Sequence, residues 1–418
     1  NIVGDEKVEP SEVLTLTMNI PTANETYFSA ISNPVYTVTI IDDDKLTPRF
    51  VNSSATLVEV DSGANASGIG ITWDKAIADN VPALSVSIAP SCITDGCTPT
   101  GNVDFSFTNT RFDFFDGNSA LLKPAANAST DIGLSIIGDD VVEPSEVLNL
   151  TMSLPIDNAE YFKTVTNAVF VATITDNDKL TPSFVGSANT FIETDSGLID
   201  TAIGLTWNKA IADNVPALTL SILPSCALKG CTENGDVDFQ LANTSLQFFD
   251  SSAATMQPNS NASLAIGLSI VGDEIVEPNE DITLTLALPA VNAEYFQGVD
   301  NNVYTVTITD NDKLTPSFIG SSNSIAEGDS GFSTSGINMT WDKAIADNVP
   351  ALSVDITPTC LANGCSVSSN EDIAFTGTQQ ISDGITATDV AAGQSVLIGL
   401  NIVGDEKVEP SEVLTLTM

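Results

Sequence analysis

The 418-residue chain carries 55 Asp and Glu against 13 Lys and Arg, which gives a formal net charge of −42, and it contains no histidine. Such a charge repels nucleic acid and anionic membrane surfaces, so cations are the natural small partners. With 42% hydrophobic and 16% charged residues, the chain can bury several cores, and no apolar run approaches the roughly 20 residues of a membrane span.

One acidic phrase, with the pattern Gly-Asp-x4-Pro-x-Glu, organises the chain as a tandem array. It begins at Gly4, Gly138, Gly272 and Gly404, and residues 401–418 repeat residues 1–18 letter for letter. Trp73, Trp207 and Trp341 recur every 134 residues. This period predicts four segments: the C-terminal half of a domain at 1–45, complete domains at 46–179 and 180–313, and a domain lacking its last strands at 314–418.

The opening segment reads as the end of a β domain. Apolar and polar residues alternate over 13–18 and again over 35–40, which predicts two half-buried strands. Asp42-Asp43-Asp44 ends the second strand, and the tetrapeptide Lys-Leu-Thr-Pro follows at 45–48 and recurs in each later copy. Proline stiffens so short a linker, so adjacent domains are expected to hold a restricted mutual angle.

Each full domain also has the pattern of short strands separated by turns. The first opens with a strand that ends in an acidic turn at 58–63, and further strand patterns occupy 68–73, 84–88, 103–107, 112–115 and 131–137, separated by turns rich in Gly, Asn, Asp and Pro. Helical periodicity longer than a turn or two is lacking, and the tryptophan is expected to pack in the core. About seven short strands per domain predict an all-β chain of tandem, immunoglobulin-like antiparallel β-sandwiches.

The six cysteines form three close pairs, Cys92/Cys97, Cys226/Cys231 and Cys360/Cys365, and a glycine precedes the second member of each pair. Glycine lets the chain turn back at positive φ, which predicts three local disulfide bonds. The alternative is a metal site, but a thiolate site normally needs four ligands and the chain has no histidine. Disulfides place the protein outside the cytoplasm, in an extracellular or cell-surface location.

The order of the acidic motifs resembles that of the Calx-β family. A strand ending in Glu and an acidic turn, as in Glu59-Val60-Asp61, is followed by Asp104 before an aromatic residue, then by the Gly-Asp-x4-Pro-x-Glu phrase, and finally by a strand closed with Asp42-Asp43-Asp44 or its equivalents. The resemblance covers every repeat. It implies a seven-stranded immunoglobulin-like sandwich with a calcium site at one end.

The resemblance also assigns calcium ligands, and calcium in a structural role is the cofactor it implies. In the opening half-domain these are Asp5, Glu9, Glu12, Asp42 and Asp44. In the two complete domains they are Glu59, Asp104, Asp139, Glu143, Glu146, Asp176 and Asp178, and Glu193, Asp238, Asp273, Glu277, Glu280, Asp310 and Asp312. In the last domain they are Glu327, Asp372, Asp405, Glu409 and Glu412. The alternative is that these acids cap turns, as Asp often does.

These patterns favour a structural function. Without histidine the Asp-Ser-Gly turns have no general base, so no enzymatic activity is expected. The leading hypothesis is a repeat region of a giant secreted protein that forms an extracellular fibre, stalk or filament, rigidified by calcium, whose partners are copies of itself or the continuation of the same chain. The alternatives are an adhesin region that binds surface or host glycans and a calcium-responsive regulatory module.

Overall fold

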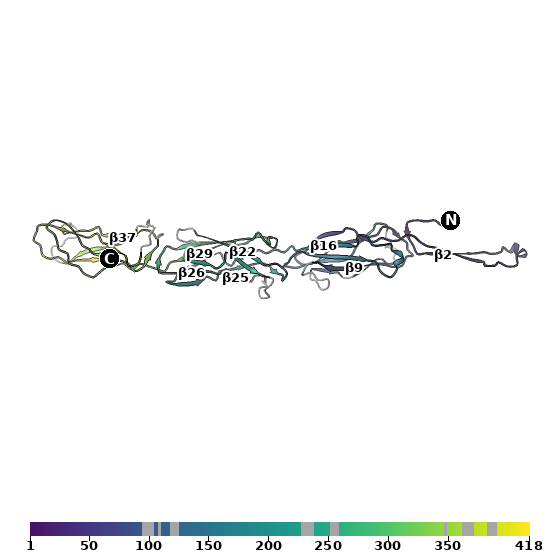
Figure 1. The fold of residues 1–418 in the computed structure, drawn as a ribbon, viewed down its shortest axis with the longest axis horizontal. Coiled ribbons are helices and arrows are strands. Elements are labelled where there is room, and N and C mark those ends of the chain that lie inside the picture. Colours follow the sequence, from purple (N-terminus) through teal and green to yellow (C-terminus); the bar gives the residue numbers. More distant parts are fainter. Residues whose placement is uncertain are drawn as a thin grey trace. The chain divides into compact units, whose positions relative to one another are not determined.

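The computed structural model describes residues 1–93, 104–107, 110–117, 125–226, 238–250, 259–346, 349–361, 372–382 and 391–418 (Figure 1). Two compact units divide the chain. The first contains Asn1–Leu180, Lys209–Pro216 and Asp250–Ser260, and the second contains Thr181–Asn208, Ala217–Phe249 and Asn261–Met418. The division into four segments stays a prediction. No helix in the described part of the chain is both long and apolar enough to cross a membrane.

The first unit begins with a two-stranded hairpin. Strand β2 (Glu12–Thr17) pairs antiparallel with β3 (Val35–Ile40), and the 3-10 helix η1 (Thr22–Tyr27) lies between them. The period-two pattern is present, and β2 and β3 form a two-stranded sheet on which Leu14 and Leu16 are about half exposed.

A complete sandwich follows in the same unit. Its larger sheet has the order β11 (Arg111–Phe115), β9 (Leu84–Cys92), β15 (Glu146–Ser153), β16 (Val169–Thr175) and β5 (Ser54–Val58). Only the β16–β5 pair in this sheet is parallel. Two smaller sheets complete it: β10 (Phe105–Phe107), β13 (Leu134–Gly138) and β6 (Gly63–Ala66); and β12 (Ser129–Asp131), β7 (Gly70–Thr72) and β4 (Arg49–Phe50). A short 3-10 helix, η2 (Ala159–Tyr161), precedes β16.

The core of this sandwich forms because alternate residues of the strands point inward. Buried and less buried residues alternate along β13 and along most of β15. Trp73 is buried and stacks on Phe114 at a ring-centroid distance of 4.9 Å, and Phe114 contacts Phe162 edge to face. The tryptophan therefore packs in the core, as predicted.

The second unit repeats this architecture. Its larger sheet has the order β18 (Ala188–Ile192), β29 (Val303–Thr309), β28 (Glu280–Ala287), β22 (Leu218–Cys226) and β24 (Ser245–Phe249). Its smaller sheets are β19 (Gly197–Asp200), β26 (Leu268–Gly272) and β23 (Phe239–Leu241); and β17 (Ser183–Phe184), β20 (Gly204–Thr206) and β25 (Ser263–Ala265). Helix η3 (Ala293–Tyr295) corresponds to η2. The predicted fold class of tandem antiparallel β-sandwiches is confirmed.

The last copy, also in the second unit, has fewer strands. Its sheets are β34 (Leu352–Asp355) with β37 (Thr378–Ser382); β35 (Thr357–Cys360) with β40 (Leu414–Thr417); β31 (Gly331–Thr334), β39 (Asn401–Gly404) and β36 (Ile373–Ala374); and β30 (Ser317–Phe318), β32 (Asn338–Thr340) and β38 (Ser395–Leu397). Residues 322–326, which correspond to β5 and β18, form no strand. Their partner in the other copies is β16 or β29, and no described strand of residues 314–418 pairs with them.

Three further two-residue pairs are parallel: β1 (Lys7–Val8) with β8 (Ala76–Ile77), β14 (Val141–Val142) with β21 (Ala210–Ile211), and β27 (Ile275–Val276) with β33 (Ala344–Ile345). Each pair lies within one compact unit. In each, the acidic phrase of one copy meets a segment about 69 residues further along the chain.

The cysteine predictions fall at the edge of the described chain. Cys92, Cys226 and Cys360 end β9, β22 and β35, and each is disulfide-bonded. Their predicted partners Cys97, Cys231 and Cys365 lie outside the described residues, so the three pairings themselves stay predictions.

Candidate metal centre

The topology of the first complete sandwich brings its predicted ligands to one end. Strands β5 and β16 run parallel and end on the pair Val58 and Thr175, so the next residues, Glu59 and Asp176, leave the sheet side by side. Strand β15 is antiparallel to β16 and starts at Glu146, opposite Ile174. The acids at the start of one strand and the end of the other therefore meet at the same edge.

The smaller sheet delivers the remaining acids in the same way. Asp104 precedes β10, Asp139 follows β13, and these strands pair antiparallel through Phe105 and Ile136. The carbonyl of Asp104 accepts the Ile137 N–H at 2.8 Å. Both side chains therefore lie at the end of the sandwich where Glu59 emerges, as the electrostatics below confirm.

Mutual repulsion and burial raise the pKa of two glutamates in this set. Burial, followed by the charges of Asp176, Asp104, Asp139 and Asp178, raises the pKa of Glu59 to about 8. Burial also raises the pKa of Glu143 to about 8, and the neighbouring charges that add to it are Asp104, Asp139, Glu59 and Glu146. All seven acids assigned to this copy thus share one electrostatic neighbourhood, and Glu59, Asp104, Glu146 and Asp178 are buried.

The second complete sandwich gathers its seven acids likewise. The pKa of Glu193 rises to about 7 through burial and the charges of Asp273, Asp310 and Asp312, against the lowering effect of the Asp273 N–H. The pKa of Glu277 rises to about 8 through burial and the charges of Asp273, Glu280 and Glu193. The proximity of Asp238 partly offsets this rise in the pKa of Glu277. The seven acids of this copy are therefore neighbours, as in the first sandwich.

The last copy forms a tighter group. One carboxylate oxygen from each of Asp372, Glu409 and Glu412 lies within 4.8 Å of the other two, close enough for a shared cation. Burial and the charges of Asp372, Asp405 and Glu327 raise the pKa of Glu409. The Asp405 N–H donates to Glu327 Oε1 at 3.2 Å. All five acids assigned to this copy are therefore neighbours.

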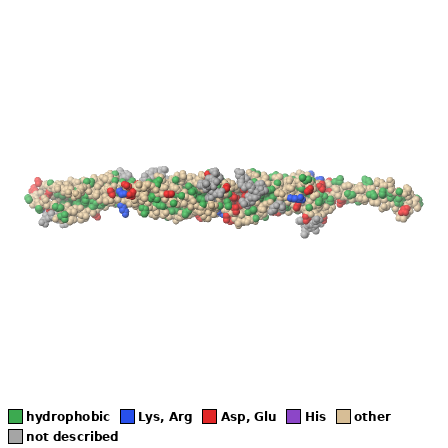
Figure 2. Space-filling model, turned by 90° about the horizontal axis from the view of Figure 1, so that it is seen from below, with side chains coloured by type: hydrophobic (Ala, Val, Ile, Leu, Met, Phe, Trp, Pro, Cys, Tyr) green, Lys and Arg blue, Asp and Glu red, His purple; other side chains and the backbone are tan. Residues whose placement is uncertain are grey.

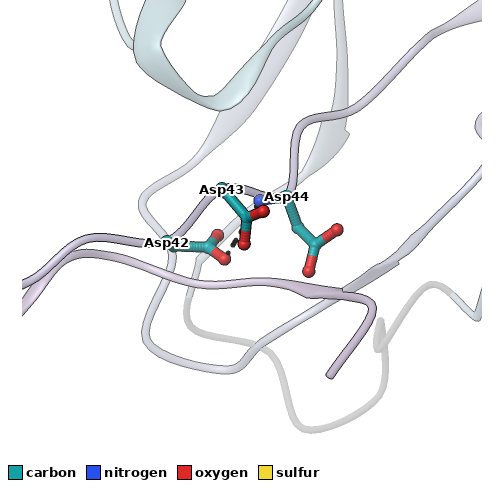
Figure 3. Close-up of side chains that lie close together, drawn as sticks. All are labelled: Asp42, Asp43 and Asp44. Atoms are coloured by element: carbon teal, nitrogen blue, oxygen red, sulfur yellow. Dashed lines mark hydrogen bonds between the residues drawn. The ribbon is translucent and has the colours of Figure 1, made fainter. Parts of the chain in front are cut away.

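The opening half-domain gathers only part of its set. Asp42, Asp43 and Asp44 lie with one oxygen each within 4.8 Å (Figure 3), and Asp42 accepts the Glu9 N–H at 2.7 Å. Glu12 is exposed at the start of β2. In this segment β2 pairs only with β3.

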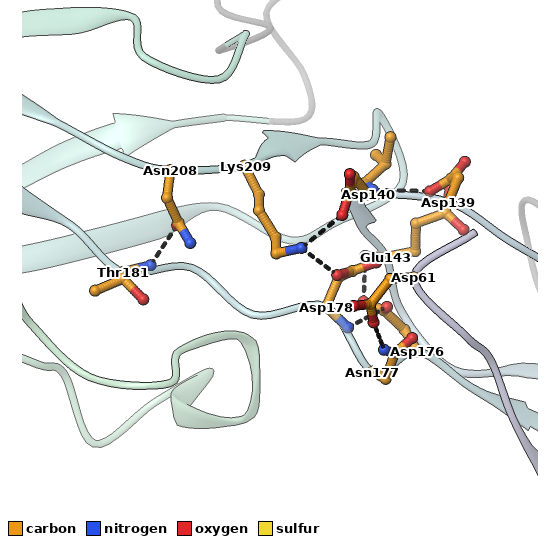
Figure 4. Close-up of polar contacts among 11 residues, drawn as sticks. Asp61, Asp139, Asp140, Glu143, Asp176, Asn177, Asp178, Thr181, Asn208 and Lys209 are labelled. Atoms are coloured by element: carbon orange, nitrogen blue, oxygen red, sulfur yellow. Dashed lines mark hydrogen bonds and ion pairs between the residues drawn. The ribbon is translucent and has the colours of Figure 1, made fainter.

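Several of these acids also cap turns, as the alternative interpretation predicts. Asp5, Asp139, Asp273 and Asp405 each accept the N–H of the residue two positions on, at 2.7–2.9 Å. Asp176 uses both oxygens, accepting the Glu143 and Asp178 N–H groups at 2.8 and 2.7 Å (Figure 4). Capping and cation binding are compatible, because these bonds hold the carboxylates in place before a cation arrives.

Two partners of the acids were not predicted from the sequence. Asn177, in the middle of the closing triplet, donates to Asp61 Oδ1 at 2.5 Å, and Asn311 donates to Asp195 Oδ1 at 2.7 Å. The middle position therefore ties the closing triplet to the opening acidic turn. Lysines also reach the triplets, as described below. Two features of the sequence could have indicated these contacts. The Asn stands in the middle of an acidic triplet, and the Lys stands in a segment that is nearly the same in three copies.

Fold and site together define a tandem array of antiparallel β-sandwiches with an acidic, oxygen-rich cluster at one end of each complete copy. The donors are carboxylates, and Asp178 and Asp312 each bury an Oδ2 atom without a hydrogen-bond partner among the described residues. Hard oxygen donors of this kind suit calcium.

No protein-family model and no curated protein matches the sequence. Among solved structures, the calcium binding domain CBD12 of CALX1.1 is 15% identical, over 62% of this chain and 98% of its own, with a TM-score of 0.24. Mouse clustered PcdhgC3 EC1-3 is 13% identical, over 73% of this chain and 78% of its own, with a TM-score of 0.26. Extracellular cadherin domains 1–5 of protocadherin gamma B2 are 11% identical, over 89% and 56%, with a TM-score of 0.27. These likenesses are distant.

The raised pKa values predict how stability depends on pH when divalent ions are chelated. Between the ordinary value of 4.5 and about 8, the folded protein holds protons on Glu59 and Glu143 that the unfolded chain has released. Stability is therefore greatest below this window and falls as pH rises through it. We expect the melting temperature in EDTA to drop by about 5 °C or more across the window. Calorimetry at stepped pH checks this, and a melting temperature that rises with pH would contradict it.

Proposed function

We propose that the chain is a structural repeat region of a secreted protein, built from Calx-β-type sandwiches that bind calcium and form part of an extracellular fibre, stalk or filament. The observation that carries this proposal is the gathering of the whole predicted acidic set at one end of each complete sandwich. Disulfide-bonded Cys92, Cys226 and Cys360 support an oxidising, extracellular location.

In this proposal calcium acts on stability. Several carboxylates in one place repel one another, and a divalent ion replaces that repulsion by coordination. An ion that binds only the folded state stabilises it by linkage, by about 2.7 kcal/mol when its free concentration is 100 times the dissociation constant. The sandwiches then act as stable spacers, and the partner of each is the next part of the same array.

The test is a calcium titration of the 418-residue chain. We expect binding by isothermal titration calorimetry and a melting temperature several degrees higher in calcium than in EDTA. Glu193→Gln is expected to weaken binding in its own copy, whereas Glu25→Gln, on helix η1 in the opening half-domain and outside every acidic set, is the charge-matched control and is expected to change nothing. If the melting temperature and the heat of titration are the same with and without calcium, the acids only cap turns.

A further inference from the structure

The acidic phrase of each sandwich is an attachment point for a short segment of the next copy. We call the residues Lys-Ala-Ile-Ala at 75–78, 209–212 and 343–346 the docking segments. The Ala78 N–H donates to the carbonyl of Val8 at 3.0 Å, and Ala212 and Ala346 donate to Val142 and Val276 at 3.0 and 3.1 Å. With the parallel pairs β1–β8, β14–β21 and β27–β33, these bonds form a short added strand at the acidic phrases that begin at Gly4, Gly138 and Gly272.

The lysine that opens each docking segment reaches an acid of the preceding closing triplet. Lys75 Nζ lies 2.7 Å from Asp44 Oδ1. Lys209 Nζ lies 2.5 Å from Asp178 Oδ1 and 2.9 Å from Asp140 Oδ1 (Figure 4). Lys343 pairs with Asp312. These partners are sheltered from solvent, since the side chains of Asp178 and Asp312 are only 2% and 1% exposed, so solvent screens these pairs less than it screens ordinary surface ion pairs.

The same kind of pairing is visible on the face of the molecule that Figure 2 shows. The chain has few cations, and most of the Lys and Arg side chains visible on the face in Figure 2 lie beside Asp or Glu.

The linker between copies is held as well. Leu46 is fully buried, its N–H donates to the Tyr161 carbonyl at 2.9 Å, and its own carbonyl accepts the Lys163 N–H at 2.9 Å. The Thr47 N–H donates to the side chain of Asp74, next to Lys75, at 2.7 Å. The linker is therefore part of the following sandwich, and little free chain remains between the two attachment points.

Two segments of identical sequence differ in whether a docking segment pairs with them. Residues 1–18 and 401–418 have the same sequence, but a docking segment covers only the first. Val8 is 0% exposed, whereas Val408 is 103% exposed, and residues 407–408 form no strand. The valine of this phrase is therefore buried where a docking segment pairs with it, and exposed where none of the described residues pairs with it.

We propose that the lysine of each docking segment is a built-in cation that locks the junction to the preceding sandwich without calcium. The two carboxylate oxygens of Asp178 and of Asp312 have different surroundings. Oδ1 contacts the lysine, and the buried Oδ2 has no hydrogen-bond partner among the described residues. The lock therefore leaves one oxygen of each acid for a metal ion. This proposal goes beyond calcium binding, because it holds whether or not the acidic clusters take up the ion.

The test is hydrogen–deuterium exchange of the whole chain in EDTA, read at the Ala78 and Ala346 amides. In the unmodified protein both are expected to be protected without calcium. Lys75→Gln is expected to speed exchange at Ala78 by about tenfold or more, because it leaves the half-buried Asp44 carboxylate without its cation. Lys343→Gln is expected to do the same only at Ala346, because it leaves the buried Asp312 carboxylate without its cation. Arg111→Gln, which removes an equal charge from an exposed ion pair with Asp113, is expected to change neither.

Two controls distinguish the loss of the lysine contact from unfolding of the sandwich. The Ile88 N–H, bonded within the first complete sandwich, reports whether that fold survives Lys75→Gln, and the second unit supplies an independent junction if it does not. Adding Asp44→Asn to Lys75→Gln is expected to cause no further loss, because the pair is already broken. The proposal is overturned if the amides are unprotected in EDTA and become protected in calcium, or if both lysine variants leave protection unchanged.

Discussion

Replacing Leu150 by alanine is expected to lower the free energy of unfolding of its sandwich by about 2–5 kcal/mol, because it opens a cavity in a close-packed core. Leu150 is 0% exposed on β15, between Phe170 of β16 and Pro90 of β9. The strands beside Leu150 are paired with β15. They cannot move into the cavity without losing that pairing.

The matched control is Leu16→Ala, one repeat earlier in the same Val-Leu-x-Leu-Thr-Met motif. Leu16 is 51% exposed and has Tyr36 as its cross-strand neighbour. Its replacement is expected to change stability by no more than about 0.5 kcal/mol. Native-state hydrogen exchange separates the two regions, since a single melting curve of a multidomain chain does not. Equal losses for the two variants would show that the β2–β3 hairpin is covered in solution, contrary to its exposure here.

The fold class was predictable because the relevant signal is local. Alternation at period two, short spacing and turn residues determine strands and their inward faces without reference to the rest of the chain, and the tryptophans packed where that pattern placed them. The gathering of the acidic sets was also predictable, since residues such as Glu59 and Asp176 stand directly after strands that the fold class places side by side.

The docking segments were not predictable, because they depend on a neighbour and not on local pattern. The sequence shared by residues 1–18 and 401–418 gives a two-residue strand with a buried valine in one place and an exposed valine in the other. In the sequence, the lysines stand in a stretch, Lys-Ala-Ile-Ala, that three copies share. Only the positions of Asp44, Asp178 and Asp312 show that each lysine has an acidic partner in the preceding copy.

The acidic phrase therefore contacts two different parts of the molecule. Its acids, such as Asp139 and Glu143, face the carboxylate cluster of their own sandwich, while its valine carbonyl accepts a hydrogen bond from the docking segment. One phrase thus joins the candidate cation site to the junction.

Replacing the glycine of this phrase tests how much depends on it. An alanine Cβ at Gly138 would overlap the carbonyl oxygen of Val60, and at Gly272 it would overlap that of Thr194. Backbone atoms cannot rotate away as a side chain does, so Gly138→Ala is expected to cost about 3 kcal/mol or more. Gly4, in the same phrase of the opening half-domain, has nothing within 4 Å of an added Cβ, and Gly4→Ala is expected to be nearly neutral.

The same close approach holds the candidate site together, because Val60 follows Glu59 and Gly138 precedes Asp139. Forcing these backbones apart separates two acids whose charges act on each other. We therefore expect Gly138→Ala to weaken calcium binding in its own copy and to leave the copy that contains Gly272 unchanged, as read by calorimetric titration and by hydrogen exchange of each sandwich. A stable Gly138→Ala protein with undiminished binding would mean that the acids do not need this approach, and that the glycine serves the strand pairing with Gly63 alone.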